Sequence, residues 1–144
     1  EDLLLVVEFL TYSLNDETPE DYAAKLPMLI QDGCRLCLEL GSKILKIPYP
    51  GSPDSCAAVT EICGDVPWAV LSAGVDHATF LGQVEAAMQN GASGVIAGRS
   101  LWKDCISLDR AVSKERLSTV AVSRLREIQA IIARYYRPER RMAA

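Results

Sequence analysis

Two charged side chains, Glu8 and Lys46, each interrupt an apolar, strand-like stretch of this sequence. Glu8 lies in LLLVVEFLTY and Lys46 lies in KILKIPY. A charge among apolar residues loses hydration free energy, so such a position is costly unless the charge has a partner or a use. A lysine in apolar surroundings loses its proton more readily, and the neutral amine attacks a carbonyl carbon. The two residues therefore indicate either a structural ion pair or Schiff-base chemistry.

A second lysine, Lys43, stands three residues before Lys46. Side chains alternate between the two faces of a strand, so the two lysines point to opposite faces. Lys43 stands where the strand begins and can reach solvent, so we expect Lys46 to be the inward lysine. Glu8, in the preceding strand, should lie beside it because neighbouring strands are about 5 Å apart. A carboxylate next to a lysine suits the proton transfers of imine chemistry.

Two further strand-like stretches end in glycine and small polar residues. PWAVLSAG ends at Ser72, Ala73 and Gly74, and SGVIAGRSLW contains Gly98 and Arg99. Glycine lets backbone N–H groups approach an oxyanion, serine donates a hydroxyl, and arginine presents a fork of N–H donors. These ends indicate a phosphate site. The alternative is a pair of ordinary glycine turns with an arginine that points to solvent.

Four strands alternate with helices along the chain. We expect strands at residues 3–12, 43–49, 67–74 and 93–102. We expect helices at residues 18–40, 52–62, 77–90 and 113–136, with a short helix near 101–105. Three helix starts are marked by the capping residues Thr18, Ser52 and Asp76. Three helix ends are marked by the glycines Gly41, Gly64 and Gly91.

Alternating strands and helices predict right-handed βαβ units on a parallel sheet. A doubly wound nucleotide-binding sheet would favour a G-x-G-x-x-G loop, which the sequence lacks. Polar residues instead follow all four strands, at the rim where (βα)8 barrels carry their active sites. A full barrel takes roughly 250 residues. We therefore predict that residues 1–144 form the C-terminal half of one TIM-barrel domain, strands five to eight. The chain begins with Glu1 and not Met, as expected of a piece of a longer protein.

Composition and charge argue against several other classes. Hydrophobic residues make up 49% and charged residues 24% of the chain, which is typical of a globular protein. No apolar run reaches the roughly 18 residues of a membrane span, and the start lacks the basic region of a secretory signal. Residues 113–144 carry 8 basic and 3 acidic side chains. The arginines are scattered around one amphipathic helix, so we expect neither a membrane nor a nucleic-acid partner.

The five cysteines and the single histidine set the expected redox and metal chemistry. Cys34 and Cys37 form a C-x-x-C pair inside a helix pattern, without a second pair to complete a zinc site. We expect buried thiols in a reducing, cytoplasmic compartment. One histidine, His77, cannot build a multi-histidine centre, so no metal or other cofactor is expected.

Several stretches together resemble one enzyme family. They are VEFLTY, KILKIPYPGS, PWAVLSAGVDHATFLGQVEAAMQNGASGVIAGRSLW and the tail RLREIQAIIARYYRP. They resemble the C-terminal half of the tagatose-1,6-bisphosphate aldolases and other class I aldolases of the DeoC/LacD type, including the sulfofructose-phosphate aldolases. The resemblance implies that Lys46 is the Schiff-base lysine and Glu8 the proton-shuttling glutamate. It also implies that a substrate phosphate is held by Ser72, Gly74, Gly98 and Arg99.

The implied reaction cleaves a phosphorylated ketose to dihydroxyacetone phosphate and an aldehyde. Candidate substrates are tagatose or fructose 1,6-bisphosphate and sulfofructose 1-phosphate. Such aldolases also carry an aspartate on strand one and further polar residues on strands one to four, which this chain lacks. We therefore expect it to need its N-terminal half or another copy of itself. Alternatives are a deoxyribose-phosphate-type aldolase or transaldolase, and a non-catalytic phosphate-binding half-barrel or assembly module.

Overall fold

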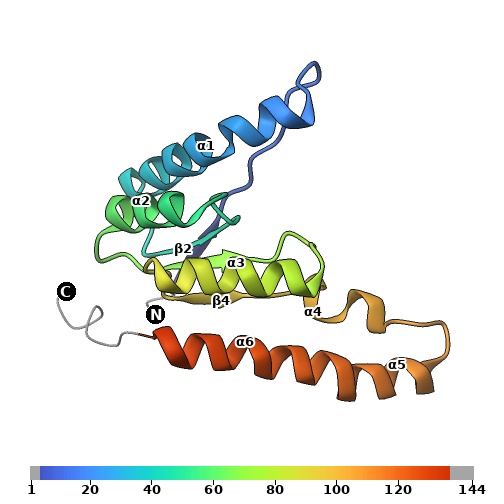
Figure 1. Ribbon diagram of the computed structural model, residues 1–144. Helices are drawn as coiled ribbons and strands as arrows, with labels where there is room; N and C mark the ends of the chain where they lie inside the picture. The colour runs from blue at the N-terminus through green and yellow to red at the C-terminus, as the bar shows by residue number, and fades with distance from the viewer. Residues whose placement is uncertain (1–3, 137–144) are drawn as a thin grey trace.

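A computed structural model of the chain describes residues 4–136. Four parallel strands form one sheet in the order β1-β2-β3-β4 (Figure 1). The strands are β1 (Val6–Glu8), β2 (Ile44–Ile47), β3 (Trp68–Leu71) and β4 (Gly94–Ile96). The expected α/β fold with a parallel sheet is confirmed.

Helices separate the strands and extend beyond the last one. The main helices are α1 (Pro19–Glu39), α2 (Pro53–Cys63), α3 (His77–Gln89), α4 (Arg99–Trp102), α5 (Arg110–Arg116) and α6 (Val122–Tyr135). A 3₁₀ turn, η1 (Lys103–Cys105), follows α4, and a π-helical turn, η2 (Leu117–Ala121), joins α5 to α6. The three expected N-caps are confirmed, since each side chain accepts a backbone N–H three residues on; they are Thr18, Ser52 and Asp76.

One face of the sheet packs against α1, α2, α3 and α6 (Figure 1). Every second strand residue points into this core, because side chains alternate along a strand. Fully buried examples are Leu45, Ile47 and Val70, which join residues such as Ile30, Val59, Phe80 and Val84 from the helices. The intervening positions face the other way and are more open on the outer strands, with Val6 42% and Ile96 38% exposed, whereas Leu71 in β3 is only 6% exposed.

All four strands are shorter than the sequence predicts, most of all the first and the last. β1 has three residues where residues 3–12 were expected, because it pairs only with β2. The expectation of a strand through residue 102 was wrong. β4 ends at Ile96, and the backbone of Gly98 (φ −142°, ψ −113°) turns the chain into α4. Arg99 therefore begins a helix and does not end a strand.

The C-terminal helical segment starts earlier and is less buried than expected. It begins at Arg110, where the Asp109 carboxylate accepts the N–H of Ala111 at 2.8 Å. Its expected apolar stripe is only partly covered. Ile128 is 2% exposed, whereas Val120 and Leu125 are 39% and 43% exposed. The buried part of the stripe packs on α3.

All five cysteines are buried, free thiols, as expected. Burial raises the pKa of Cys56 to about 12, so this thiol stays protonated near neutral pH. Within residues 4–136 we find no helix with the length and apolar character needed to cross a bilayer.

Candidate active site

Lys46 and Glu8 meet on the open face of the sheet. Parallel pairing of β1 with β2 sets the two residues opposite each other, and Lys46 Nζ lies 2.7 Å from Glu8 Oε2. Leu45 and Ile47, on either side of Lys46, point into the helix-covered core. Lys46 therefore points to the face of the sheet opposite the helices, as alternation along the strand predicts. Lys43 precedes β2 and is exposed.

The pair has the geometry for a short proton transfer. At 2.7 Å the ammonium donates a charge-assisted hydrogen bond to the carboxylate. Moving one proton along this bond produces a neutral amine, which is a nucleophile, and a carboxylic acid, which is a proton donor. The side chains of Lys46 and Glu8 are 23% and 38% exposed, so a ligand in solution can reach both.

The loop after β3 is a tight turn with two left-handed residues. The N–H of Val75 bonds to the carbonyl of Ser72 at 3.1 Å, and the central residues Ala73 and Gly74 have φ of 47° and 80°. Positive φ at both central positions is the geometry of a type I′ turn. In the described part of the chain, neither Ala73 nor Gly74 uses its backbone N–H in a hydrogen bond. Both donors remain available to an anion.

Arg99 brings its guanidinium against this turn. Its Cζ lies 3.5 Å from the point where a Cβ on Gly74 would stand. Any larger residue at position 74 would have to share this space and adopt a positive φ, so glycine serves both needs. Among residues 4–136, no carboxylate lies within ion-pair distance of Arg99. Within the described chain, the guanidinium is therefore a cation without a carboxylate counter-ion.

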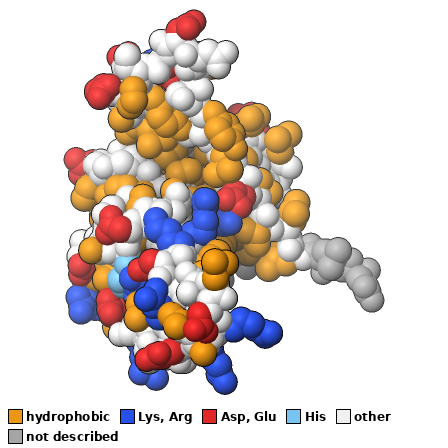
Figure 2. Space-filling view, turned by 90° about the vertical axis from the view of Figure 1, so that its right-hand side faces the viewer, with side chains coloured by type: hydrophobic (Ala, Val, Ile, Leu, Met, Phe, Trp, Pro, Cys, Tyr) orange, Lys and Arg blue, Asp and Glu red, His pale blue; other side chains and the backbone are white. Residues whose placement is uncertain are grey.

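One groove of about 620 Å³ contains both groups of residues. All seven residues singled out from the sequence line it, namely Glu8, Lys46, Ser72, Ala73, Gly74, Gly98 and Arg99. Figure 2 shows the corresponding end of the molecule, where Lys and Arg side chains gather beside a hollow lined by hydrophobic ones. The strand ends thus bring an amine, a carboxylate and a candidate anion site into one space.

Sequence reasoning missed other residues of the groove. Tyr22 of α1 and Thr11 share a hydrogen bond of 2.6 Å between their hydroxyls, and both residues line the groove. Trp102 lines it as well. Tyr22 stands at an apolar helical position in the sequence, and helical spacing alone does not distinguish a core tyrosine from one that lines a site.

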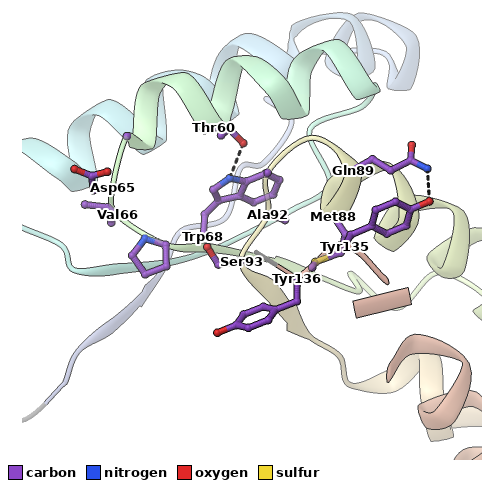
Figure 3. A pocket seen from close by; sticks show the side chains of 13 residues that line it. Thr60, Asp65, Val66, Trp68, Met88, Gln89, Ala92, Ser93, Tyr135 and Tyr136 are labelled. Atoms are coloured by element: carbon purple, nitrogen blue, oxygen red, sulfur yellow. Dashed lines mark hydrogen bonds between the residues drawn. The ribbon is translucent and has the colours of Figure 1, made fainter. Parts of the chain in front are cut away.

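A second, smaller cavity of about 120 Å³ lies at the amino ends of β3 and β4 (Figure 3). The Trp68 indole N–H donates to Thr60 at 3.0 Å, and the Gln89 amide donates to the Tyr135 hydroxyl at 2.8 Å. Among residues 4–136, the lining of this cavity includes no lysine, arginine, histidine or cysteine. The larger groove, which contains Lys46, is therefore the candidate active site.

Metal ligands do not converge in the described residues. Between residues 4 and 136 no group of three or more His, Cys, Asp or Glu side chains is placed to hold a metal ion. The imidazole of His77 lies 3.0 Å from a Glu127 carboxylate oxygen, away from the groove lining.

The chain thus combines a parallel α/β sheet with a lysine–glutamate pair and an arginine near its strand ends. The sequence model of the DeoC/LacD family aldolases matches residues 1–104. The chain belongs to this family.

Similar proteins of known sequence include archaeal enzymes. The fructose-bisphosphate aldolase class 1 of Thermoproteus tenax is 33% identical over 93 residues, which are 61% of this chain and 35% of that enzyme. The 2-amino-3,7-dideoxy-D-threo-hept-6-ulosonate synthase 1 of Archaeoglobus fulgidus is 40% identical over 75 residues, or 51% of this chain and 27% of that enzyme. This chain matches about a third of these relatives' length.

Solved structures give the same picture of the fold. A Schiff-base-forming fructose-1,6-bisphosphate aldolase, studied through its reaction intermediates, matches with a TM-score of 0.59 at 26% identity. The match covers 82% of this chain and 45% of that one. An archaeal fructose 1,6-bisphosphate aldolase matches with a TM-score of 0.57 at 25% identity, covering 83% and 46%. The chain thus spans less than half of the solved aldolases it resembles.

Proposed function

We propose that this chain supplies the Schiff-base half of a class I aldolase, as strands five to eight of a (βα)8 barrel. Its substrate would be a phosphorylated ketose such as tagatose or fructose 1,6-bisphosphate, or sulfofructose 1-phosphate. The observation that carries the proposal is the 2.7 Å contact of Lys46 with Glu8 in the groove that also holds Gly74 and Arg99. The coverage of the solved aldolases, 45–46% of their length, supports the half-barrel assignment.

In this proposal Lys46 attacks the ketone carbon and Glu8 moves the protons. Glu8 first accepts a proton from the ammonium, and the free amine adds to the carbonyl to give a carbinolamine. The carboxylic acid of Glu8 then protonates the departing hydroxyl, which leaves as water while a protonated imine forms. Glu8, again a carboxylate, accepts the proton of the hydroxyl on the carbon that becomes the aldehyde, while the iminium cation accepts the electron pair of the breaking carbon–carbon bond. An aldehyde departs, and an enamine of dihydroxyacetone phosphate remains on Lys46, to be protonated and hydrolysed.

The phosphate of the ketose would lie at the turn after β3. The free N–H groups of Ala73 and Gly74, the Ser72 hydroxyl and the Arg99 guanidinium are donors of the kind that hold a phosphate. Gly98 lets the chain turn so that Arg99 reaches Gly74. Holding the phosphate fixes the distance from the ketone carbon to the lysine, which raises the effective concentration of the reacting atoms. The free thiols fit a reducing compartment such as the cytoplasm.

Borohydride reduction tests this proposal directly. The chain is incubated with dihydroxyacetone phosphate, reduced, digested and analysed by mass spectrometry. We expect a stable adduct on the peptide that contains Lys46, because reduction converts an imine into a secondary amine. A non-catalytic phosphate-binding module, favoured by the exposed apolar side chains of the open sheet face, would bind the phosphate without any covalent mass.

A further inference from the structure

The turn after β3 is held by two residues, Ser100 and Lys103, that follow Arg99 and that the phosphate assignment does not include. Ser100 in α4 is 2% exposed, and its hydroxyl donates to the carbonyl of Val75 at 2.6 Å. Lys103 in η1 donates from Nζ to the carbonyl of Gly74. The two residues are three apart on one helical turn, so both reach the same loop.

These contacts place two cations, Arg99 and Lys103, against one residue, Gly74. The Arg99 guanidinium packs on Gly74 from one side, and the Lys103 ammonium bonds to the carbonyl of the same glycine. Within the described chain, neither cation forms an ion pair with a carboxylate. The acid next to Lys103 in sequence, Asp104, is bound by both guanidinium nitrogens of Arg124, at 2.6 and 2.8 Å. Like charges repel, and an anion between them relieves that repulsion.

Both cations keep hydrogen-bond donors free for such an anion. An ammonium has three N–H donors, and Lys103 uses one of them on Gly74. A guanidinium has five, and no described residue accepts any from Arg99. The carbonyls of Gly74 and Val75 are occupied by Lys103 and Ser100, so they are not free to repel an anion. The N–H groups of Ala73 and Gly74 remain open.

We infer that Lys103 is a second cation of the phosphate site and that Ser100 is the positioning residue that fixes the turn. This inference rests on the proposed function and deepens it, because it specifies the charge of the ligand group. Two cations and two free N–H groups match a phosphate monoester dianion better than a singly charged or neutral group.

The test is a calorimetric titration of dihydroxyacetone phosphate into the full 144-residue chain and its variants. Lys103→Met keeps the aliphatic stem and removes the charge, and we expect its affinity to fall roughly tenfold, the scale of one charge-assisted hydrogen bond. Lys114→Met is the matched control, since Lys114 is an exposed lysine of α5 that, in the described part of the chain, forms no hydrogen bond to the turn after β3, whereas Lys103 does. We expect the affinity of the control to equal that of the unchanged chain.

Ser100 is tested by comparing two substitutions. Ser100→Ala removes the hydroxyl that holds the turn, and Ser100→Thr keeps it. We expect Ser100→Ala to lower the affinity for dihydroxyacetone phosphate several-fold. Ser100→Thr should keep most of the affinity of the unchanged chain. A merely structural serine would lower the melting temperature in Ser100→Ala without changing the affinity of the folded fraction. That result would overturn the positioning role.

The outcomes separate this inference from the function on which it rests. If Arg99→Ala weakens binding while Lys103→Met and a second variant, Lys103→Gln, do not, then Lys103 is not part of the site. If neither Arg99→Ala nor Lys103→Met changes binding, the phosphate assignment itself is wrong. If the affinity for dihydroxyacetone phosphate falls more steeply with salt in the unchanged chain than in Lys103→Met, this result supports Lys103 as the second cation.

Discussion

At the scale of single residues, the ion pair of Lys46 with Glu8 has little structural value of its own. Both side chains are accessible, at 23% and 38%, and accessible ion pairs contribute about 0–1 kcal/mol to folding. The pair lies on the open face of the sheet, outside the core. A chemical role therefore explains its position better than a stabilising one does.

We predict that Lys46→Met abolishes borohydride trapping of dihydroxyacetone phosphate and that Lys43→Met does not. The two lysines belong to the same stretch, but only Lys46 lies in the groove beside Glu8. Intact mass after reduction measures the adduct in each variant. Retained trapping in Lys46→Met together with its loss in Lys43→Met would show that the facing assignment is wrong.

Arg99→Ala should discriminate between phosphorylated and plain ketones. We expect the binding of dihydroxyacetone phosphate to weaken by about 1.5–3 kcal/mol, the scale of a charge-assisted hydrogen bond. The loss should be much smaller for dihydroxyacetone, which lacks the phosphate. Competition titrations with both ketones give the ratio of the two losses, and a ratio near one contradicts the phosphate role of Arg99.

At the scale of elements, Gly33 fixes how α1 approaches the chain after β1. A Cβ at this position would lie 2.5 Å from the ring of Phe9. We expect Gly33→Ala to destabilise the chain by about 1–3 kcal/mol through overpacking, even though alanine favours helix. Gly82 in α3 is the matched control because nothing lies within 4 Å of its added Cβ. Gly82→Ala should stabilise the chain by up to about 1 kcal/mol. Urea unfolding measures the free energy of unfolding of both variants. Equal changes in the two variants would show that the Phe9 ring moves aside without cost.

Asp104 links η1 to α6 through Arg124 and makes part of the folding stability depend on pH. Hydrogen bonds from Arg124 hold the pKa of the Asp104 carboxyl at about 2, below its unfolded value of about 3.9. A depressed folded pKa contributes stability above the unfolded pKa, and this contribution is lost as pH falls through the folded value. We predict that Asp104→Asn lowers the melting temperature at pH 6 and that its difference from the unchanged chain shrinks toward pH 2. A pH-independent difference would contradict this linkage.

The sequence predicts the elements well where local chemistry decides their ends. Thr18, Ser52 and Asp76 cap their helices as expected because a side-chain oxygen and a nearby N–H suffice. The extent of β4 was wrong because strand length depends on pairing, which is not local. The same error hid Ser100, since a residue assigned to a strand is not expected to bond back to the preceding turn from a helix. Lys46 and Glu8 could be paired in advance because adjacent parallel strands leave few possible registers.

At the scale of the whole molecule, the sheet and α6 both leave apolar side chains exposed. Val6 and Ile96 on the sheet are 42% and 38% exposed, and Leu125 on α6 is 43% exposed. Exposed apolar surface and unpaired strand edges favour association. The proposed half-barrel gives these surfaces one natural partner, the first four βα units.

We predict that the 144-residue chain self-associates and turns over poorly. Co-expression with an N-terminal half from a longer relative, or fusion to it, should give a particle of one barrel with aldolase activity. Analytical ultracentrifugation and a coupled aldolase assay on both samples measure the outcome. A monomeric chain with full turnover would refute the half-barrel assignment.

The strand order β1-β2-β3-β4 has a consequence for how the chain is made. Each strand pairs with the next one in sequence, so the order of emergence from the ribosome equals the order across the sheet. The first strand pair is complete once residue 47 has emerged, and each later helix adds cover to a ladder already begun. Among these four strands each partner is the next strand in sequence, which keeps loop closure within this sheet short and favours fast folding. The Lys46–Glu8 contact is therefore available during synthesis before the β3 turn and Arg99 that flank it have been made.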